Sequence, residues 1–255
     1  MVITEEDEFY LPLSIDHLLK NCQGEILEVV CARNPLLPSK LKTARTFYNA
    51  FGFSPVFFQG MRVAKAKFLN IFGWLNFSGR YFSIKRVCQT HSMPYSYCDN
   101  VNAADFLDHC RELNIDLIAS VSPTQIFKEN LINLPKYGCI NIHTATLPKY
   151  RGLYPTYWAM ACGEKTVGIS VHYIEKGIDT GRIILQDEVA IPSGTTLDNM
   201  LTKTKLKGAE LLVESIKKID SNTAEPFYAE GKGTYFSFPT PESYKKFSHF
   251  GYKLW

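Results

Sequence analysis

Short apolar runs that alternate with helical segments constrain the fold of this sequence most. Residues 2–4 (VIT) and 26–32 (ILEVVCA) have the pattern of strands, and a helix is expected between them over 13–21. The run 115–121 (IDLIASV) is apolar on both faces, as in a strand that helices cover on both sides. Strand, helix and strand within about thirty residues are typical of a parallel α/β sheet. We therefore expect an α/β fold with a mostly parallel sheet.

The same patterns predict the other elements. Helices are expected over 41–51, 63–75, 103–113, 125–130, 155–162 and 197–219, and strands through Asn141 and His143 and over 167–173 and 183–189. We expect Thr4 to cap the first helix, with the acidic residues 5–7 in its first turn. The dinucleotide fingerprint G-x-G-x-x-G is missing from the first turn, which disfavours NAD or FAD.

Composition narrows the class of protein. The 255 residues are 45% hydrophobic and 21% charged, which is typical of a globular protein. No apolar run approaches the roughly 18 residues of a membrane span, and acidic residues stand where a signal peptide would be basic. The seven cysteines form no C-x-x-C pair, which favours reduced thiols over a zinc site or a disulfide framework. We expect a cytoplasmic protein.

The charges are distributed unevenly. Between Val29 and Cys98 there are ten basic and no acidic residues, so the rest of the chain holds 18 of the 28 basic residues and all 25 acidic ones. Within 33–92, two X-Pro sequences, Asn34-Pro35 and Leu37-Pro38, precede a helical segment dense in aromatic side chains. Its aromatic residues include Phe47, Phe51, Phe57, Phe58, Phe68, Phe72, Trp74, Phe77 and Phe82.

Three interpretations of this basic aromatic insertion remain open. Its aromatic face can pack on the sheet. It can also pack on a second subunit, and the protein would then be a homodimer. Alternatively, its cations and aromatic rings can meet an anionic membrane surface, as a peripheral protein does. The third interpretation is a surface for nucleic acid or for a nucleotide phosphate.

Polar side chains that are suited to transfer chemistry follow an apolar strand. Asn141 and His143 are two residues apart, so the alternation of a strand puts them on one side. The turn Gly-Ile-Asp-Thr-Gly at 177–181 then offers the carboxylate of Asp179. An amide, an imidazole and a carboxylate in one pocket can orient a carbonyl, move a proton and tune the imidazole.

These residues belong to an ordered set of motifs that resembles the folate-dependent formyltransferase family. The motifs are Asn141-Ile142-His143, Leu147-Pro148-Lys149-Tyr150-Arg151-Gly152, Gly163-Glu164, Thr166-Val167-Gly168 and Gly177-Ile178-Asp179-Thr180-Gly181. The resemblance covers about 117–186 and implies a Rossmann-like formyltransferase fold, 10-formyltetrahydrofolate as co-substrate and no metal. One departure is Ala145, which stands where the family has a serine and puts substrate contacts in doubt.

The resemblance assigns catalytic roles to three residues. Asn141 would donate an N–H to the oxyanion of a tetrahedral intermediate. His143 would take a proton from the attacking amine, or donate to the oxyanion when charged. Asp179 would raise the pKa of the imidazole and relay a proton through a water. Because the chain has no G-x-S-x-G motif, we expect direct transfer without a covalent enzyme intermediate.

The family also suggests binding residues by position. Its pterin lies between two loops that correspond here to 120–126 and 175–179. The expected folate contacts are Ser120, Ser122, Gln125, Ile126, Gly177 and Ile178. Lys149 and Arg151 would meet a substrate phosphate or the glutamate tail of folate. His172, on the strand 167–173, is interpreted as structural.

The expected domain division is a catalytic domain over 1–220, which includes the insertion 33–92, and a C-terminal extension over 221–255. Only 36 residues follow Ile219, too few for the tRNA-binding barrel of methionyl-tRNA formyltransferases, so we expect no nucleic acid partner. The segment 233–240 (GTYFSFPT) resembles the tails of formyltransferases that act on amino sugars.

We therefore expect the acceptor to be a nucleotide-linked amino sugar of surface-polysaccharide synthesis. Four alternatives remain. The acceptor can be glycinamide ribonucleotide or methionyl-tRNA, the protein can be a formyltetrahydrofolate hydrolase, or it can be a non-enzymatic binding module.

Overall fold

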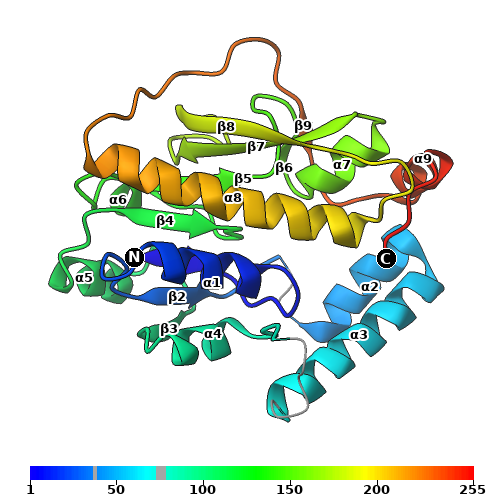
Figure 1. Cartoon of the computed structure of the whole chain (residues 1–255), viewed down its shortest axis with the longest axis horizontal. Helices are drawn as coiled ribbons and strands as arrows, with labels where there is room; N and C mark the ends of the chain where they lie inside the picture. The colour runs from blue at the N-terminus through cyan, green and yellow to red at the C-terminus, as the bar shows by residue number, and fades with distance from the viewer. Residues whose placement is uncertain (37–38, 73–78) are drawn as a thin grey trace.

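A seven-stranded sheet organises the protein, and the computed structural model describes residues 1–36, 39–72 and 79–255 (Figure 1). The strands lie in the order β3-β2-β1-β4-β5-β7-β8. Their bounds are β1 Val2–Thr4, β2 Val29–Ala32, β3 Tyr95–Cys98, β4 Ile118–Val121, β5 Cys139–His143, β7 Thr166–Tyr173 and β8 Ile183–Ala190. The strands β1 to β5 pair in parallel, whereas β7 pairs antiparallel with β5 and β8 antiparallel with β7. The α/β fold with a mostly parallel sheet is confirmed.

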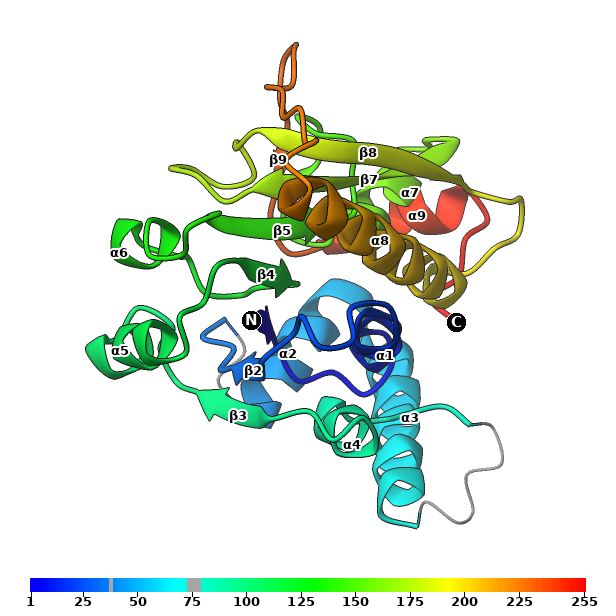
Figure 2. The same cartoon turned by 60° about the vertical axis from the view of Figure 1, so that its left-hand side comes forward.

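Helices cover both faces of the parallel part of the sheet (Figures 1 and 2). On one face lie α1 (Leu11–Asn21), α4 (Ile84–Thr90) and α8 (Leu197–Asp220), whose buried apolar side chains form one core cluster with the strands. On the other face lie α5 (Ala104–Glu112) and α6 (Glu129–Ile132), which enclose a second cluster. Each fully buried Leu, Ile or Val contributes about 1.5–3 kcal/mol, so these two clusters supply most of the driving force for folding.

A third cluster joins the helices beside the carboxyl ends of the strands. It contains side chains of α7 (Pro155–Ala161), α9 (Pro241–His249) and α2 (Lys40–Phe51). The ring of Phe51 meets Tyr157 and Tyr244 edge to face, at centroid distances of 5.8 and 5.3 Å. Because α3 (Phe53–Ile71) follows α2 directly, the two helices form a hairpin that is anchored by α2. We call residues 40–71 the α2–α3 hairpin.

The C-terminal segment also packs against the catalytic half of the chain. Its short strand β9 (Tyr235–Phe236) pairs with β6 (Arg151–Gly152), which lies just after β5 in the sequence. A capping box formed by Thr240 and Ser243 begins α9. The C-terminal segment therefore packs against the residues that follow Asn141 and His143 in the sequence.

Several predicted boundaries were wrong. Thr4 does not cap α1, because the Asp7 carboxylate accepts the backbone N–H groups of residues 9–11 and the helix begins at Leu11. The helix expected over 125–130 is reduced to α6, since residues 122–128 form a loop. The helix expected over 63–75 begins earlier, at Phe53, and ends at Ile71.

The strands β3, β6 and β9 and the helices α4 and α9 were not predicted. The strand β3 (YSYC) is only half-buried at the sheet edge, so it lacks the apolar run that marks the other strands. The helix α4 lies within the segment interpreted as an insertion, yet Ile84, Val87 and Cys88 are fully buried in the main core. The part of that segment outside the sheet's own layers is therefore the α2–α3 hairpin. Leu37, Pro38, Trp74 and Phe77, which were also assigned to the insertion, lie outside the described residues.

Membrane spans and cysteines can be compared with the sequence. Among the described residues, no helix is both long enough and apolar enough to cross a bilayer. The expectation of a cytoplasmic protein stays a prediction. All seven cysteines are free thiols, and Cys162 is exposed.

Candidate active site

Strand register brings two polar side chains together at the centre of the site. Asn141 on β5 lies directly opposite His172 on β7, so both side chains project from the same face of the sheet. The Asn141 amide Nδ2 is 3.3 Å from His172 Nε2. His172 Nδ1 is 2.8 Å from the Tyr173 carbonyl, which can only accept, so Nδ1 carries a hydrogen. In neutral His172, Nε2 is then an acceptor for the Asn141 amide.

The interpretation of His172 as structural missed this contact. The side chain is 2% exposed and contacts Asn141, one of the predicted catalytic residues. Its place depends on the pairing of β5 with β7 and on a register shift between Val171 and His172. A pattern within one strand cannot show which residue of a distant strand lies opposite.

His143 lies two residues beyond Asn141 on the same face of β5. Its Nε2 is 2.8 Å from the Tyr150 carbonyl and donates to it, which fixes the ring. Its other nitrogen, Nδ1, lies 3.6 Å from Asp179 Oδ2. Neutral His143 therefore presents an Nδ1 lone pair next to the carboxylate.

Asp179 lies between the two imidazoles. Its Oδ2 accepts the backbone N–H of Gly152 at 2.8 Å, and its Oδ1 lies 3.6 Å from His172 Nε2. Asp179 has a left-handed backbone with φ of 52°, a conformation uncommon outside Gly, Asn and Asp. The turn at 177–181 thus aims the carboxylate at the end of β5. The structure brings Asn141, His143 and Asp179 together, and it adds His172.

Burial and charge set the protonation of this group. Burial lowers the pKa of His143, and the neighbouring Asp179 offsets part of that effect. Burial alone would raise the pKa of Asp179, but the two histidines and the Gly152 N–H outweigh it and lower the pKa to about 2. Near neutral pH the site therefore holds an ionised carboxylate beside a neutral His143, which can act as a base.

Two buried oxygen atoms on the neighbouring strands β4 and β5 have no hydrogen-bond partner among the described residues. They are Asn141 Oδ1 and Ser120 Oγ. Ser120 on β4 is the register partner of Asn141, so the two side chains are neighbours across the strands. A buried polar atom without a hydrogen bond lowers the stability of the fold by about 1–3 kcal/mol, so two such atoms side by side call for an explanation. A polar ligand could donate hydrogen bonds to Ser120 Oγ and Asn141 Oδ1.

The residues expected to contact folate occupy two loops. Ser122 has φ of 58° at the end of β4, and Ile126 is 73% exposed. On the aspartate loop, Ile178 is 45% exposed and Gly177 has φ of 108°, which a larger residue would adopt only with strain. Among these expected contacts, Ile126 and Ile178 therefore present apolar surface and Gly177 presents backbone.

Gln125 is hydrogen-bonded to backbone groups of three other residues. Its Nε2 donates to the carbonyls of Arg33 and Asp99 at 2.9 and 3.0 Å. Its Oε1 accepts the N–H of Val101 at 3.0 Å. The amide therefore holds the loop against the backbone that follows β2 and β3, and the expected contact with folate stays a prediction.

A second charged group lies at the point where the strand order reverses. The chain leaves β1 toward α1 on one face of the sheet and leaves β4 toward α6 on the other, and open α/β sheets bind ligands at such a point. Lys205 reaches this point from α8 and donates to Ser122 Oγ. Burial lowers the pKa of Lys205, and Glu5 and Asp7 oppose that effect. Sequence reasoning missed this lysine, because it lies on a helix far from every motif.

Glu5 shares this environment with Lys205. Burial is the main reason that the pKa of Glu5 rises to about 7, with Asp7 adding to the effect and Lys205 opposing it. A hollow of about 240 Å³ lies beside it, lined by Glu5, Glu6, Cys31, Ala32, Arg33, Asn34 and Tyr97. The carboxyl ends of β1, β2 and β3 therefore border a polar recess.

Arg151 and Lys149 lie on the segment that connects β5 to α7. Arg151 Nε is buried and has no hydrogen-bond partner among the described residues, and the next residue, Gly152, holds Asp179. Lys149 is exposed. Arg151 thus precedes the residue whose backbone binds the Asp179 carboxylate, and Lys149 lies at the surface.

Aromatic rings of the C-terminal segment line this edge. Phe236 stacks on Tyr150 and Trp158, with centroid distances of 5.4 and 4.6 Å. Phe238 meets Tyr154 edge to face at 4.8 Å. The segment 233–240 therefore forms an aromatic wall beside Arg151.

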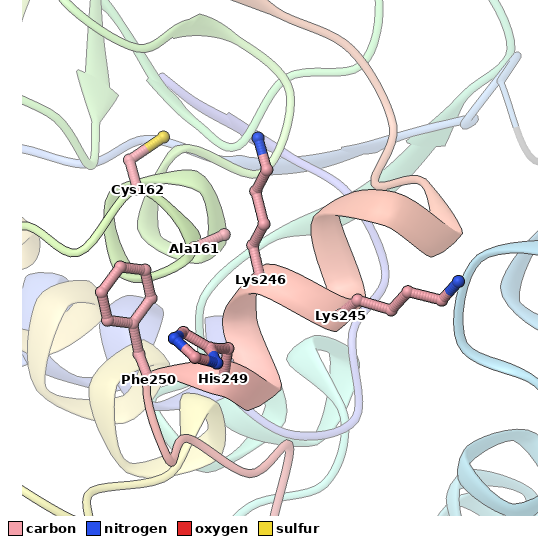
Figure 3. A pocket seen from close by; sticks show the side chains of 6 residues that line it. All are labelled: Ala161, Cys162, Lys245, Lys246, His249 and Phe250. Carbon is pink, nitrogen blue, oxygen red and sulfur yellow. The ribbon is translucent and has the colours of Figure 1, made fainter.

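A larger hollow lies elsewhere, between α7 and α9 (Figure 3). Its volume is about 610 Å³, and its lining residues are Ala161, Cys162, Lys245, Lys246, His249 and Phe250. It is lined by none of the residues that surround Asn141. We therefore place the active site at the end of β5.

A model of a protein family described as formyl transferase matches residues 84–216, just over half of the chain. This chain belongs to that family. The matched residues include Asn141, His143 and Asp179, and the resemblance inferred from the sequence motifs is confirmed at the level of the family.

Relatives in the family include methionyl-tRNA formyltransferases. That of Thermodesulfovibrio yellowstonii is 34% identical over 152 residues, which cover 60% of this chain and 49% of that protein. That of Clostridium beijerinckii is 35% identical over 158 residues, covering 62% and 51%. The chain thus spans about half the length of the curated relatives that it matches.

Solved structures share the fold. The sugar 3N-formyltransferase WlaRD, crystallised with dTDP and 5-N-formyl-THF, superposes with a TM-score of 0.56 at 20% identity, over 92% of this chain and 68% of that one. The N-formyltransferase of Helicobacter canadensis, in complex with folinic acid and dTDP-3-aminofucose, gives 0.57 at 22% identity, over 92% and 70%. Phosphoribosylglycinamide formyltransferase of Bacillus halodurans gives 0.58 at 16% identity, over 86% and 94%.

Proposed function

We propose that this chain is an N-formyltransferase that moves a formyl group from 10-formyltetrahydrofolate to an amine. The observation that carries the proposal is the convergence of Asn141, His143 and Asp179 at the end of β5, with a neutral base beside an ionised carboxylate. Membership of the formyl transferase family supports it. The folate supplies a formyl group on nitrogen, and the protein groups stabilise its transfer.

Asn141 stabilises the oxyanion. Attack of the amine on the formyl carbon forms a carbon–nitrogen bond and turns the carbonyl oxygen into an oxyanion. One Asn141 amide hydrogen is directed to His172, and the second is free to donate to the oxyanion. Such a donor contributes about 2.7–4 kcal/mol to lowering the barrier.

His143 moves the proton. Its Nδ1 lone pair accepts a proton from the attacking amine, and the carboxylate of Asp179, 3.6 Å away, stabilises the imidazolium that forms. The same proton passes to the folate nitrogen as the carbon–nitrogen bond to the folate breaks. The hydrogen bond to the Tyr150 carbonyl keeps the ring in place throughout.

The donor is proposed to lie across the two loops at 120–126 and 175–179. Ser120 and Ser122 would offer hydroxyl groups, while Ile126, Gly177 and Ile178 would offer apolar and backbone surface to the pterin. The exposure of Ile126 and Ile178 supports this placement. Gln125 would act indirectly, by fixing the loop.

For the acceptor we propose a nucleotide-linked amino sugar. The aromatic wall of Phe236 and Phe238 beside Arg151 suits a sugar ring with an anionic nucleotide. The fold likeness to sugar N-formyltransferases over 92% of the chain supports this choice. The proposed role of the product is in surface-polysaccharide synthesis. Lys149 and Arg151 would contact the phosphates.

Methionyl-tRNA is the second candidate acceptor. It is favoured by the sequence identity of 34% to the enzyme of Thermodesulfovibrio yellowstonii.

We also propose a division of the chain into a catalytic unit over 1–220 and a C-terminal extension over 221–255. In that division the extension contributes the aromatic wall to the acceptor side of the site.

A transfer assay tests the function. The protein is incubated with 10-formyltetrahydrofolate and, separately, dTDP- and UDP-linked amino sugars, methionyl-tRNA and glycinamide ribonucleotide. We expect a formamide product with an amino sugar and none with its N-acetylated counterpart, which lacks the free amine. Formate release without any acceptor would indicate a hydrolase, and inertness to every acceptor would contradict the proposal.

A further inference from the structure

We propose that the outer face of α3 docks on an anionic membrane surface. Apolar side chains repeat along this face every third or fourth residue, the spacing that forms a stripe on a helix. The stripe residues are Phe53, Phe57, Met61, Ala64, Phe68 and Ile71, and all are exposed. We call this set the α3 stripe.

The α3 stripe is exposed to a degree that is unusual for large apolar side chains. Phe53 and Ile71 are 71% and 74% exposed, and Phe57 and Met61 are 53% and 56% exposed. The opposite face of the helix is turned inward, where Ala66 is buried and Arg62 pairs with Asp198. The helix is therefore held on the body of the protein by one face while its apolar face points to solvent.

Cations border the α3 stripe on both sides. At 3.6 residues per turn, Lys65 projects on one side of the stripe and Lys67, whose Nζ lies 3.6 Å from Glu8 Oε1, projects on the other. Lysines in these positions can extend to lipid phosphates while the apolar side chains between them enter the interface. On the neighbouring helix α2, Lys42 and Arg45 are exposed as well.

Charge decides between lipid and a second copy of the chain. The sequence from Val29 to Cys98 holds ten basic and no acidic residues, so two hairpins packed stripe to stripe would bring only cations together. An anionic bilayer satisfies both the apolar stripe and the cations at its borders. The surface potential of such a membrane extends over about one Debye length, roughly 8 Å at physiological salt.

The position of the hairpin gives this contact a consequence. Phe47 of α2 meets Tyr154 and Phe238 edge to face, at 6.5 and 5.3 Å, and these two residues belong to the aromatic edge of the active site. In Figure 1 the arrowhead of β4 points toward the side of the molecule where α2 and α7 lie. Docking through the α3 stripe therefore holds the active-site edge near the lipid headgroups.

Vesicle sedimentation tests the inference without any measurement of catalysis, so its outcome is independent of the proposed function. The full chain is mixed with vesicles of phosphatidylcholine alone or of phosphatidylcholine with phosphatidylglycerol. We expect binding to the anionic vesicles that weakens with added salt. The double variant Phe57→Asp, Met61→Asp should bind at least about tenfold more weakly.

Two controls sharpen this test. Leu27→Asp alters an exposed apolar residue that precedes the amino end of β2 and lies outside the α2–α3 hairpin. This variant should bind vesicles as the wild type does. Sedimentation velocity of the wild type and the double variant measures self-association. Equal vesicle binding by the double variant, or no preference for anionic lipid, would overturn the inference. A dimer that the double variant abolishes would assign the stripe to a second copy instead and would also overturn it.

Discussion

The active site buries polar side chains, whereas the α2–α3 hairpin exposes apolar ones. At the end of β5, Asn141, His143 and His172 are 5%, 6% and 2% exposed, and strand register or a backbone carbonyl holds each of them. On α3, Phe53 and Ile71 are more than two-thirds exposed. The site therefore depends on fixed positions within the sheet. The hairpin adds no strand to that sheet and is free to match an outside partner.

Substitution of the catalytic residues separates the two regions most strongly. Asn141→Ala, His143→Ala and Asp179→Ala should each lower turnover by about 10²–10⁴-fold, since each removes an oxyanion donor, a base or its stabilising charge. Steady-state kinetics measure the loss, and circular dichroism checks the fold. His249→Ala, which removes an exposed imidazole from α9, is the matched control. Near wild-type rates in all three variants would contradict the mechanism.

Lys205→Met should have the next largest effect. The variant removes the charge that opposes Glu5 and Asp7 and the donor to Ser122 Oγ. We expect KM for donor or acceptor to rise by about tenfold, the equivalent of one lost charge-assisted hydrogen bond. Lys203→Met, an exposed lysine two residues away on α8, should leave KM unchanged. If both variants behave alike, Lys205 takes no part in binding.

His172 is a positioning residue, so its loss should cost less than the loss of Asn141. His172→Ala removes the acceptor that orients the Asn141 amide, and kcat should fall by about tenfold while KM stays the same. His172→Gln retains a polar group within reach and should restore part of kcat. A rise in KM with unchanged kcat would show that His172 acts on binding instead.

The pH dependence follows from burial. The pKa of His143 lies below its ordinary value of 6.5, so kcat should fall only in acid and stay level through neutral pH. Asp179 raises the pKa of His143, so Asp179→Asn should move the titration of that imidazole to still lower pH. Histidine NMR signals can follow both proteins through a pH titration. A shift toward higher pH in the variant would show that Asp179 does not face His143 as an anion.

The hairpin variant should have the smallest effect on catalysis. Phe57→Asp with Met61→Asp alters exposed side chains on α3, so turnover of a water-soluble acceptor should stay within about twofold of the wild type. The transfer assay measures it. A large loss would mean that the α3 stripe takes part in the active site, and the contrast between the two regions would fail.

Local patterns in the sequence predicted the sheet and much of the site. The strands through Asn141 and over 167–173 were found because their apolar runs or alternation are strong, and the chain order of the motifs pointed to Asp179. These features depend on residues close together in the chain. The turn at 177–181 could be predicted for the same reason.

Features that depend on distant pairing could not be predicted. His172 joins the site through its register with Asn141, and Lys205 reaches Ser122 across 83 positions of sequence. Gln125 was assigned to the ligand because its loop is well placed, and the sequence did not reveal its hydrogen bonds to the backbone that follows β2 and β3. Each case turns on a contact between elements whose packing a single sequence does not reveal.

Direct observation of the transferred carbon tests the central claim best. The donor carries a ¹³C-labelled formyl group, and NMR follows the label in the presence of a dTDP- or UDP-linked amino sugar, with wild-type protein and with Asn141→Ala. The mechanism predicts that wild-type protein moves the label into a formamide on the sugar amine, about 10²–10³-fold faster than the variant. Label that appears as formate, or equal rates in both proteins, would contradict it.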